Sequence, residues 1–164
     1  MGSEIERKFL VRGDAWKKLA TDHTRIRQAY LTSDGKASIR VRIKDDGDAI
    51  LTVKSRGAEL RRLELEYKVP TLEAEAMLAL CTGAVVEKVR HLVPWNGLTW
   101  EIDVFEGDND GLTIAEVELR DEHQRVDLPD WIGAEVTGQP QYYNSYLARR
   151  PFCSWTSLRV GSAH

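Results

Sequence analysis

Charged side chains recur two residues apart along this chain, and apolar residues fill most of the positions between them. Side chains two apart on a β-strand point to the same face of the sheet, so each pair marks one face of one strand. The pairs are sorted by sign, which a face that only meets water does not require. They are Glu4/Glu6, Arg40/Arg42, Glu64/Glu66, Lys88/Arg90, Glu101/Asp103 and Glu116/Glu118. The pattern predicts a sheet with a binding site on one face.

Runs with this alternation, separated by turn sequences rich in Gly, Asn and Asp, predict about eight strands joined largely as hairpins. The strands are expected near residues 3–11, 25–31, 37–44, 49–55, 60–68, 85–94, 98–106 and 113–120.

Helical patterns fall between and after these strands. Asp14 is a candidate first residue for a helix near 14–20, and Thr71 is a candidate N-cap for a helix from 72 to about 81. Further helical patches are expected near 121–126 and 141–149. The sequence thus predicts an α+β protein in which helices are few and short.

Composition limits the class of protein. The chain has 164 residues, of which 42% are hydrophobic and 30% charged, as in a soluble globular domain. A net charge of −3 argues against a general nucleic-acid binder. No run of 18 apolar residues and no zinc-like cysteine spacing occurs, so we expect a cytoplasmic protein without a membrane partner. Residues 1–150 are predicted to form one domain, followed by a tail or short helix over 151–164.

About eight antiparallel strands can close into a barrel that is filled by side chains or holds one small ligand. Parity alone leaves two arrangements open, with either the apolar or the charged positions inside. Sign sorting favours charges inside, because buried charges need partners and a metal-bound polyanion supplies both kinds. The prediction is a closed eight-stranded antiparallel β-barrel, a tunnel with a charged interior and helices packed on the outside.

The opening Glu4-Ile5-Glu6-Arg7-Lys8 resembles the ExExK signature of the CYTH superfamily, the triphosphate tunnel metalloenzymes. The resemblance runs from residue 4 to about 149 and is to the short bacterial members that hydrolyse inorganic tripolyphosphate. Further matching elements follow in order: Gln28-Ala29-Tyr30, Arg40 and Arg42, Thr52 and Lys54, Glu64 and Glu66, Lys88 and Arg90, Glu101, Asp103 and Phe105, Glu116 and Glu118, and a terminal WIGAEVTG…YYNSYLA.

The resemblance implies roles for individual residues. Substrate phosphates would be bound by Lys8, Arg40, Arg42, Lys54, Lys88 and Arg90. Mg²⁺ or Mn²⁺ would be bound by Glu4, Glu6, Glu64, Glu66, Asp103, Glu116 and Glu118. Tyr30 and Lys54 resemble a tyrosine–lysine pair that handles a proton, and Lys88 is a third expected catalytic residue.

The implied function is a divalent-metal-dependent triphosphatase that converts tripolyphosphate to pyrophosphate and phosphate as a monomer or homodimer. One alternative is a nucleotide or organic triphosphate enzyme of the same family, such as an adenylyl cyclase or thiamine triphosphatase. The chain has no obvious extra segment for the base pocket that a cyclase needs. Another alternative is a non-catalytic polyphosphate-binding module, against which the many carboxylates argue, because they weaken pure anion binding.

Overall fold

The computed structural model describes the backbone of residues 2–32, 35–56 and 61–155, and the side chains of these residues other than 2–4 and 61. Within these residues, no helix is long and apolar enough to span a membrane.

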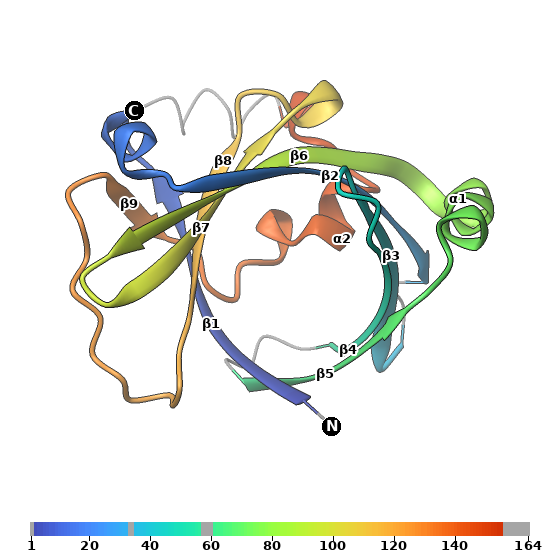
Figure 1. Ribbon diagram of the computed structural model, residues 1–164, viewed down its shortest axis with the longest axis horizontal. Helices are drawn as coiled ribbons and strands as arrows, with labels where there is room; N and C mark the ends of the chain where they lie inside the picture. The colour runs from blue at the N-terminus through green and yellow to red at the C-terminus, as the bar shows by residue number, and fades with distance from the viewer. Residues whose placement is uncertain (1, 33–34, 57–60, 156–164) are drawn as a thin grey trace.

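One antiparallel sheet of nine strands dominates the fold (Figure 1), in the order β5-β4-β3-β2-β6-β7-β8-β1-β9. All eight predicted strands are present, because each combines alternating burial with a turn at its ends. The strands are β1 (Gly2–Val11), β2 (Asp22–Thr32), β3 (Ala37–Lys44), β4 (Ala49–Ser55), β5 (Arg61–Lys68), β6 (Thr82–Trp95), β7 (Leu98–Phe105), β8 (Thr113–Glu118) and β9 (Ile132–Glu135).

Strand β1 has three partners. Residues 2–5 pair with β5, residues 6–10 pair with β8, and Phe9 and Val11 pair with β9 around a register shift. The prediction of a mostly antiparallel sheet with few helices is confirmed. The closed eight-stranded barrel is corrected: β9 adds a ninth strand at the end of β1, the sheet order runs from β5 to β9, and β1 meets β5 through only four residue pairs.

The apolar parity of the strands faces outwards. Helix α1 (Thr71–Leu80) lies outside the curve of the sheet and packs Ala74 against Val41 and Ile43 of β3 (Figure 1). The predicted N-cap is off by one residue, because Pro70 holds that position and the Thr71 hydroxyl donates to the Gly47 carbonyl at 3.0 Å.

A second outer cluster covers β1, β7 and β8. The short 3₁₀ helix η1 (Ala15–Leu19), at the predicted 14–20 position, contributes the buried Trp16 to it. Edge-to-face contacts join Trp100 to Phe9 at 5.6 Å and to Trp131 at 5.7 Å between ring centroids. Buried aromatic rings of this size account for much of the burial on this side of the sheet.

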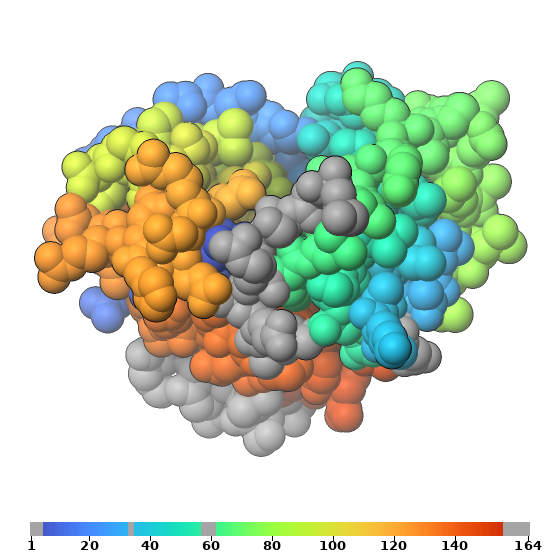
Figure 2. Space-filling view, turned by 90° about the horizontal axis from the view of Figure 1, so that it is seen from below, coloured from blue at the N-terminus to red at the C-terminus, as the bar shows by residue number. Residues whose placement is uncertain are grey.

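The C-terminal elements depart from the prediction. No helix forms over 121–126, where the chain makes turns instead. The 141–149 patch becomes η3 (Pro140–Tyr142) and α2 (Asn144–Leu147), which lie inside the curve of the sheet rather than outside it (Figure 1). Two further 3₁₀ turns are η2 (Gly107–Asn109) and η4 (Phe152–Ser154). In Figure 2 the stretch from about residue 140 to 155, in dark orange to red, lies in the lower part of the molecule.

Gly83 explains how α2 comes so close to the sheet. Its φ is +78°, and a Cβ at this position would lie 2.6 Å from the Ala148 carbonyl oxygen, which no side chain tolerates. The neighbouring Ala84 N–H donates to the same oxygen at 2.8 Å. The end of α2 is therefore fixed to β6 at one point.

Candidate functional site

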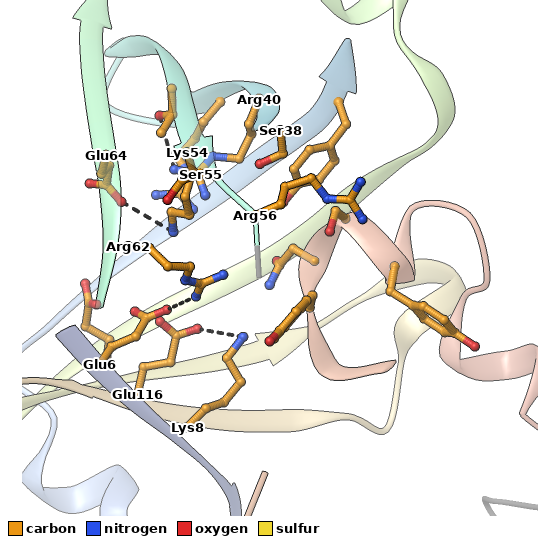
Figure 3. Close-up of a pocket in the computed structure, with 18 of the residues that line it drawn as sticks. Glu6, Lys8, Ser38, Arg40, Lys54, Ser55, Arg56, Arg62, Glu64 and Glu116 are labelled. Carbon is orange, nitrogen blue, oxygen red and sulfur yellow. Dashed lines mark hydrogen bonds and ion pairs between the residues drawn. The ribbon is translucent and has the colours of Figure 1, made fainter. Parts of the chain in front are cut away.

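A charged cavity of about 490 Å³ lies between the inner face of the sheet and the α2 segment. Twelve of the predicted site residues line it (Figure 3), because the inward parity of seven strands meets there. They are Glu6, Lys8, Tyr30, Arg40, Arg42, Lys54, Glu64, Glu66, Lys88, Arg90, Glu116 and Glu118. The side chain of Glu4 lies outside the described residues, and Asp103 is not part of the lining.

On the β3 side, the two arginines have neutral partners. Arg42 Nε donates to Gln28 Oε1 at 2.8 Å, and Arg40 Nη2 donates to Thr52 Oγ1 at 3.2 Å. Arg40 Nε is buried without a hydrogen-bond partner among the described residues, none of which offers either arginine a carboxylate. Burial, followed by repulsion from Arg40 and Arg90, lowers the pKa of Arg42 to about 9. This wall is short of negative charge.

On the β6–β7 side, the bases share one buried acid. Lys88 Nζ lies 2.7 Å from Asp103 Oδ2, and Arg90 donates to the two oxygens of Asp103 at 2.8 and 2.9 Å. Burial alone would lower the pKa of Arg90, but the charge and hydrogen bonds of Asp103 outweigh it and raise that pKa well above the usual value. Asp103, predicted as a metal ligand, has both oxygens engaged by Lys88 and Arg90.

The surroundings of Lys88 on this wall also change its pKa. Burial, which outweighs attraction to Asp103, lowers the pKa of Lys88. The Lys88 ammonium also donates to Asn144 Oδ1 of α2 at 2.9 Å. A buried ammonium with these two acceptors is held in a fixed position beside the cavity.

Carboxylates gather where β1 meets β8. Glu6 pairs with Glu118 in register, and Lys8 pairs with Glu116. Glu6 and Glu116 lie close enough together for Glu6 to influence the pKa of Glu116. Burial raises the pKa of Glu116, but Lys8 and then Arg90 outweigh this and hold it well below its usual value.

Two cations neutralise these acids within the cavity (Figure 3). Lys8 Nζ lies 3.6 Å from Glu116 Oε1, and Arg62 Nη2 lies 3.1 Å from Glu6 Oε1. No group of three metal-ligating side chains is arranged around a single point among the residues that the structure describes. The donor set nevertheless fits a hard divalent cation, which prefers carboxylate oxygens and can displace the ammonium and guanidinium groups.

The remaining predicted residues lie between these regions. Lys54 Nζ is 3.3 Å from Glu64 Oε2, and Glu66 follows on the same face of β5. Tyr30 lies opposite Arg40 in the register of β2 and β3 and is 6% exposed. The structure thus brings Tyr30 and Lys54 into one cavity, with Lys54 paired to an acid.

The cavity lining also includes residues that were not among the predicted site residues, Arg62, Tyr143 and Asn144 among them. Arg62 shares the parity of Glu64 and Glu66, so the pattern itself contained the signal for it. Tyr143 and Asn144 lie in the terminal motif that resembles the family, but their segment was expected on the outside of the sheet. The Tyr143 ring lies beneath two cations, 5.2 Å from Lys8 Nζ and 5.4 Å from the Arg62 guanidinium carbon.

Comparison with known proteins agrees with this architecture. Residues 2–149 match the model of the CYTH domain. The chain is 48% identical over 153 residues to an inorganic triphosphatase of Acetivibrio thermocellus, covering 93% of this chain and 97% of that protein. It is 36% identical over 151 residues to an inorganic triphosphatase of Nitrosomonas europaea, covering 89% and 97%.

A solved structure has a similar fold. The crystal structure of an inorganic triphosphatase superposes with a TM-score of 0.63 at 32% identity, covering 90% of this chain and 95% of the other. A family model that spans most of the chain and relatives of this similarity identify its family. The chain belongs to the CYTH domain family.

Proposed function

We propose that this protein is an inorganic triphosphatase that hydrolyses tripolyphosphate to pyrophosphate and phosphate in the charged cavity. The observation that carries the proposal is the pair of half-buried arginines, Arg40 and Arg42, without a carboxylate partner among the described residues. Two cations without a counter-ion among these residues fit an anionic ligand. The names of the two similar curated proteins support the same activity.

The basic side chains would hold the phosphates. Arginine offers planar, bidentate donors to phosphate oxygens, and lysine offers a point charge. The proposed set is Lys8, Arg40, Arg42, Lys54, Lys88 and Arg90, to which the structure adds Arg62. Asp103 would serve this set by fixing Lys88 and Arg90, rather than by binding metal.

The acids of β1 and β8 would hold a divalent cation such as Mg²⁺ or Mn²⁺. Glu6, Glu116 and Glu118 are the proposed ligands, and Glu4, Glu64 and Glu66 extend the acidic set along β1 and β5. A bound cation supplies charge withdrawal from phosphorus and lowers the pKa of a bound water. The carboxylates would hold the cation within the cavity.

Tyr30 and Lys54 are proposed to handle the proton. Both line the cavity, and Lys54 is held by Glu64 at 3.3 Å. An ordered phenol beside several cations can accept or donate a hydrogen bond in the reaction. Lys88, whose pKa burial lowers, is the third proposed catalytic residue.

We further propose that the curved sheet works as a tunnel wall within a single domain over residues 1–150. The pairing of β1 with both β5 and β8 supports this. Because α2 lies inside the curve, the cavity would be approached from the other end. We also propose that it acts in the cytoplasm as a monomer or homodimer without a membrane partner, and the net charge of −3 argues against a nucleic-acid partner.

The test is phosphate release from tripolyphosphate, ATP, thiamine triphosphate and pyrophosphate, each with Mg²⁺, with Mn²⁺ and with a chelator. We expect the highest kcat/KM for tripolyphosphate and no turnover with the chelator. A preference for ATP or thiamine triphosphate would replace this proposal by the organic triphosphate alternative. Binding of tripolyphosphate without turnover under any condition would support the non-catalytic module.

The proposed metal ligands are tested by Glu116→Gln, with Glu73→Gln on the exposed face of α1 as the matched control. Loss of one negative ligand weakens a hard-cation site without opening a cavity. We expect Glu116→Gln to lose most turnover and metal affinity, and the control to keep both. Full turnover of Glu116→Gln at the metal concentration that saturates the parent would remove it from the ligand set.

A further inference from the structure

The Asn144 side chain, at the start of α2, connects the two basic walls of the cavity. Its Oδ1 accepts hydrogen bonds from Gln28 Nε2 at 2.9 Å and from Lys88 Nζ at 2.9 Å. Gln28 in turn accepts from Arg42 Nε at 2.8 Å. A continuous chain of hydrogen bonds therefore runs from Arg42 through Gln28 and Asn144 to Lys88.

The chemistry of the two cations fixes which way both amides point. An arginine Nε and a lysine Nζ can only donate, so each must face an amide oxygen. Arg42 therefore orients Gln28 with its oxygen towards the guanidinium and its NH₂ towards Asn144. Lys88 independently requires the oxygen of Asn144 on the same side. The two requirements agree, so neither amide can rotate by 180° without losing hydrogen bonds.

This orientation leaves the Asn144 NH₂ group available. Both acceptor positions of Oδ1 are used, whereas Nδ2 makes no hydrogen bond to any residue that the structure describes. Asn144 lines the cavity, but Gln28 is fully buried and does not. The free donor of Asn144 thus belongs to the cavity, next to Lys88.

The backbone that carries Asn144 is held in place. The Tyr143 carbonyl accepts from the N–H groups of Tyr146 and Leu147, each at 3.0 Å, and the buried Leu147 packs with Val86. At the other end of α2, the Ala148 carbonyl oxygen contacts β6 at Gly83. A donor on such a fixed element is suited to recognise one position of a ligand.

We propose that Asn144 is a substrate-binding residue that donates from Nδ2 to a phosphate oxygen, and that Gln28 is a positioning residue that fixes this orientation. The identity of the ligand, tripolyphosphate, rests on the proposed function. A neutral donor beside Lys88 adds a hydrogen bond to the anion without adding to the repulsion among Arg42, Lys88 and Arg90. Hydrogen bonds to charged groups are stronger than neutral ones.

The test is calorimetric titration of tripolyphosphate into the protein with a chelator present, so that binding is measured without turnover. We expect Asn144→Ala to weaken binding about tenfold or more, since a hydrogen bond to a charged group is lost. Gln141→Ala on the same segment, which is outside the cavity lining, should bind like the parent. Affinity of Asn144→Ala within about twofold of the parent, with an unchanged circular dichroism spectrum, would overturn the proposal.

Gln28→Glu tests the positioning role separately. It keeps an acceptor for Arg42 but removes the donor to Asn144, so Asn144 gains by turning its NH₂ away from the cavity and towards residue 28. We expect weaker binding, and a double variant with Asn144→Ala no weaker than the poorer single variant. Independent, additive losses would mean that Gln28 does not act through Asn144.

Two further results keep the test decisive. If Asn144→Ala does not fold, Asn144→Ser replaces it, because a hydroxyl keeps one donor and one acceptor. The affinity of Asn144→Ser for tripolyphosphate is then expected to lie between that of the parent and that of the Gln28→Glu variant. An affinity equal to that of the parent would count against the proposal. In turnover with metal, Asn144→Ala should raise KM more than it lowers kcat. If the parent binds tripolyphosphate but never releases phosphate, the proposed function fails while the affinities still decide the role of Asn144.

Discussion

The two basic walls of the cavity carry similar charges but differ in what holds them. On β3, Arg40 and Arg42 are held by the neutral side chains of Thr52 and Gln28. On β6, Arg90 and Lys88 are held by the buried Asp103. The positive charge of the β3 wall is therefore available to a ligand, whereas much of the charge of the β6–β7 wall is neutralised by a carboxylate of the protein.

This difference predicts that the two walls contribute differently to ligand binding and to the stability of the fold. Removing one partner of a buried ion pair leaves an uncompensated charge and is strongly destabilising. Removing a buried charge that has no counter-ion relieves the protein of a cost. The β3 wall is thus expected to matter for binding more than for stability, and the β6–β7 wall for both.

The largest expected effect is on the β6–β7 wall. Asp103→Asn removes the shared counter-ion of Lys88 and Arg90 and should lower the free energy of unfolding by about 3–5 kcal/mol, as measured by urea denaturation. Glu101→Gln is the control, because Arg90 is the ion-pair partner of Glu101 among the described residues and the Glu101 side chain is 39% exposed. Unchanged stability of Asp103→Asn with reduced metal affinity would support the metal-ligand role that the resemblance implied.

On the β3 wall we expect activity and stability to separate. Arg42→Gln should lower kcat/KM for tripolyphosphate by about 100-fold or more, the usual cost of losing a donor at an anionic transition state. Its free energy of unfolding should equal or exceed that of the parent, because burial and neighbouring cations disfavour the Arg42 charge and lower its pKa. Arg90→Gln should lose both. Equal destabilisation by the two substitutions would abolish the distinction between the walls.

Ligand binding should stabilise the folded protein through the β3 wall. At a concentration of 100 times the dissociation constant, a ligand adds about 2.7 kcal/mol to the free energy of unfolding. With a chelator present, tripolyphosphate should raise the melting temperature of the parent and raise that of Arg42→Gln much less. An equal shift in both would place the anion on other residues.

The smallest effect is expected at Tyr30. Tyr30→Phe removes only a hydroxyl, and we expect kcat to fall more than KM rises. If Tyr30 and Lys54 act as a unit, the double variant with Lys54→Ala should be little worse than the poorer single variant. Steady-state kinetics of the three variants across pH would decide. Additive losses confined to KM would leave both residues as binding groups.

Much of the fold followed from the alternation of charged and apolar residues. All eight predicted strands were found, because period-2 patterns bounded by turn residues are strong local signals. Sign sorting also predicted the inner face correctly, because the paired charges line the cavity. The site roles assigned from the resemblance remain predictions, although the cavity brings most of those residues together.

What could not be predicted depends on long-range geometry. The strand Ile132–Glu135 is only four residues long and forms because β1 offers an edge, so its own sequence gives a weak signal. The inward position of α2 depends on Gly83, which lies about sixty residues earlier in the chain. The burial of Asp103 behind Lys88 and Arg90 was invisible for the same reason, because parity shows a face but not the depth of a side chain.

The three partners of β1 have a consequence for how the chain is assembled. During synthesis β1 emerges before all three of its partners, which are β5 near residue 61, β8 near 113 and β9 near 132. The backbone hydrogen-bonding groups of β1 therefore remain unpaired with these strands until most of the polypeptide has left the ribosome. Pairings this distant in sequence fold slowly, and a waiting strand edge is open to association with other chains. We expect the need for chaperones and the yield on expression to depend on β1.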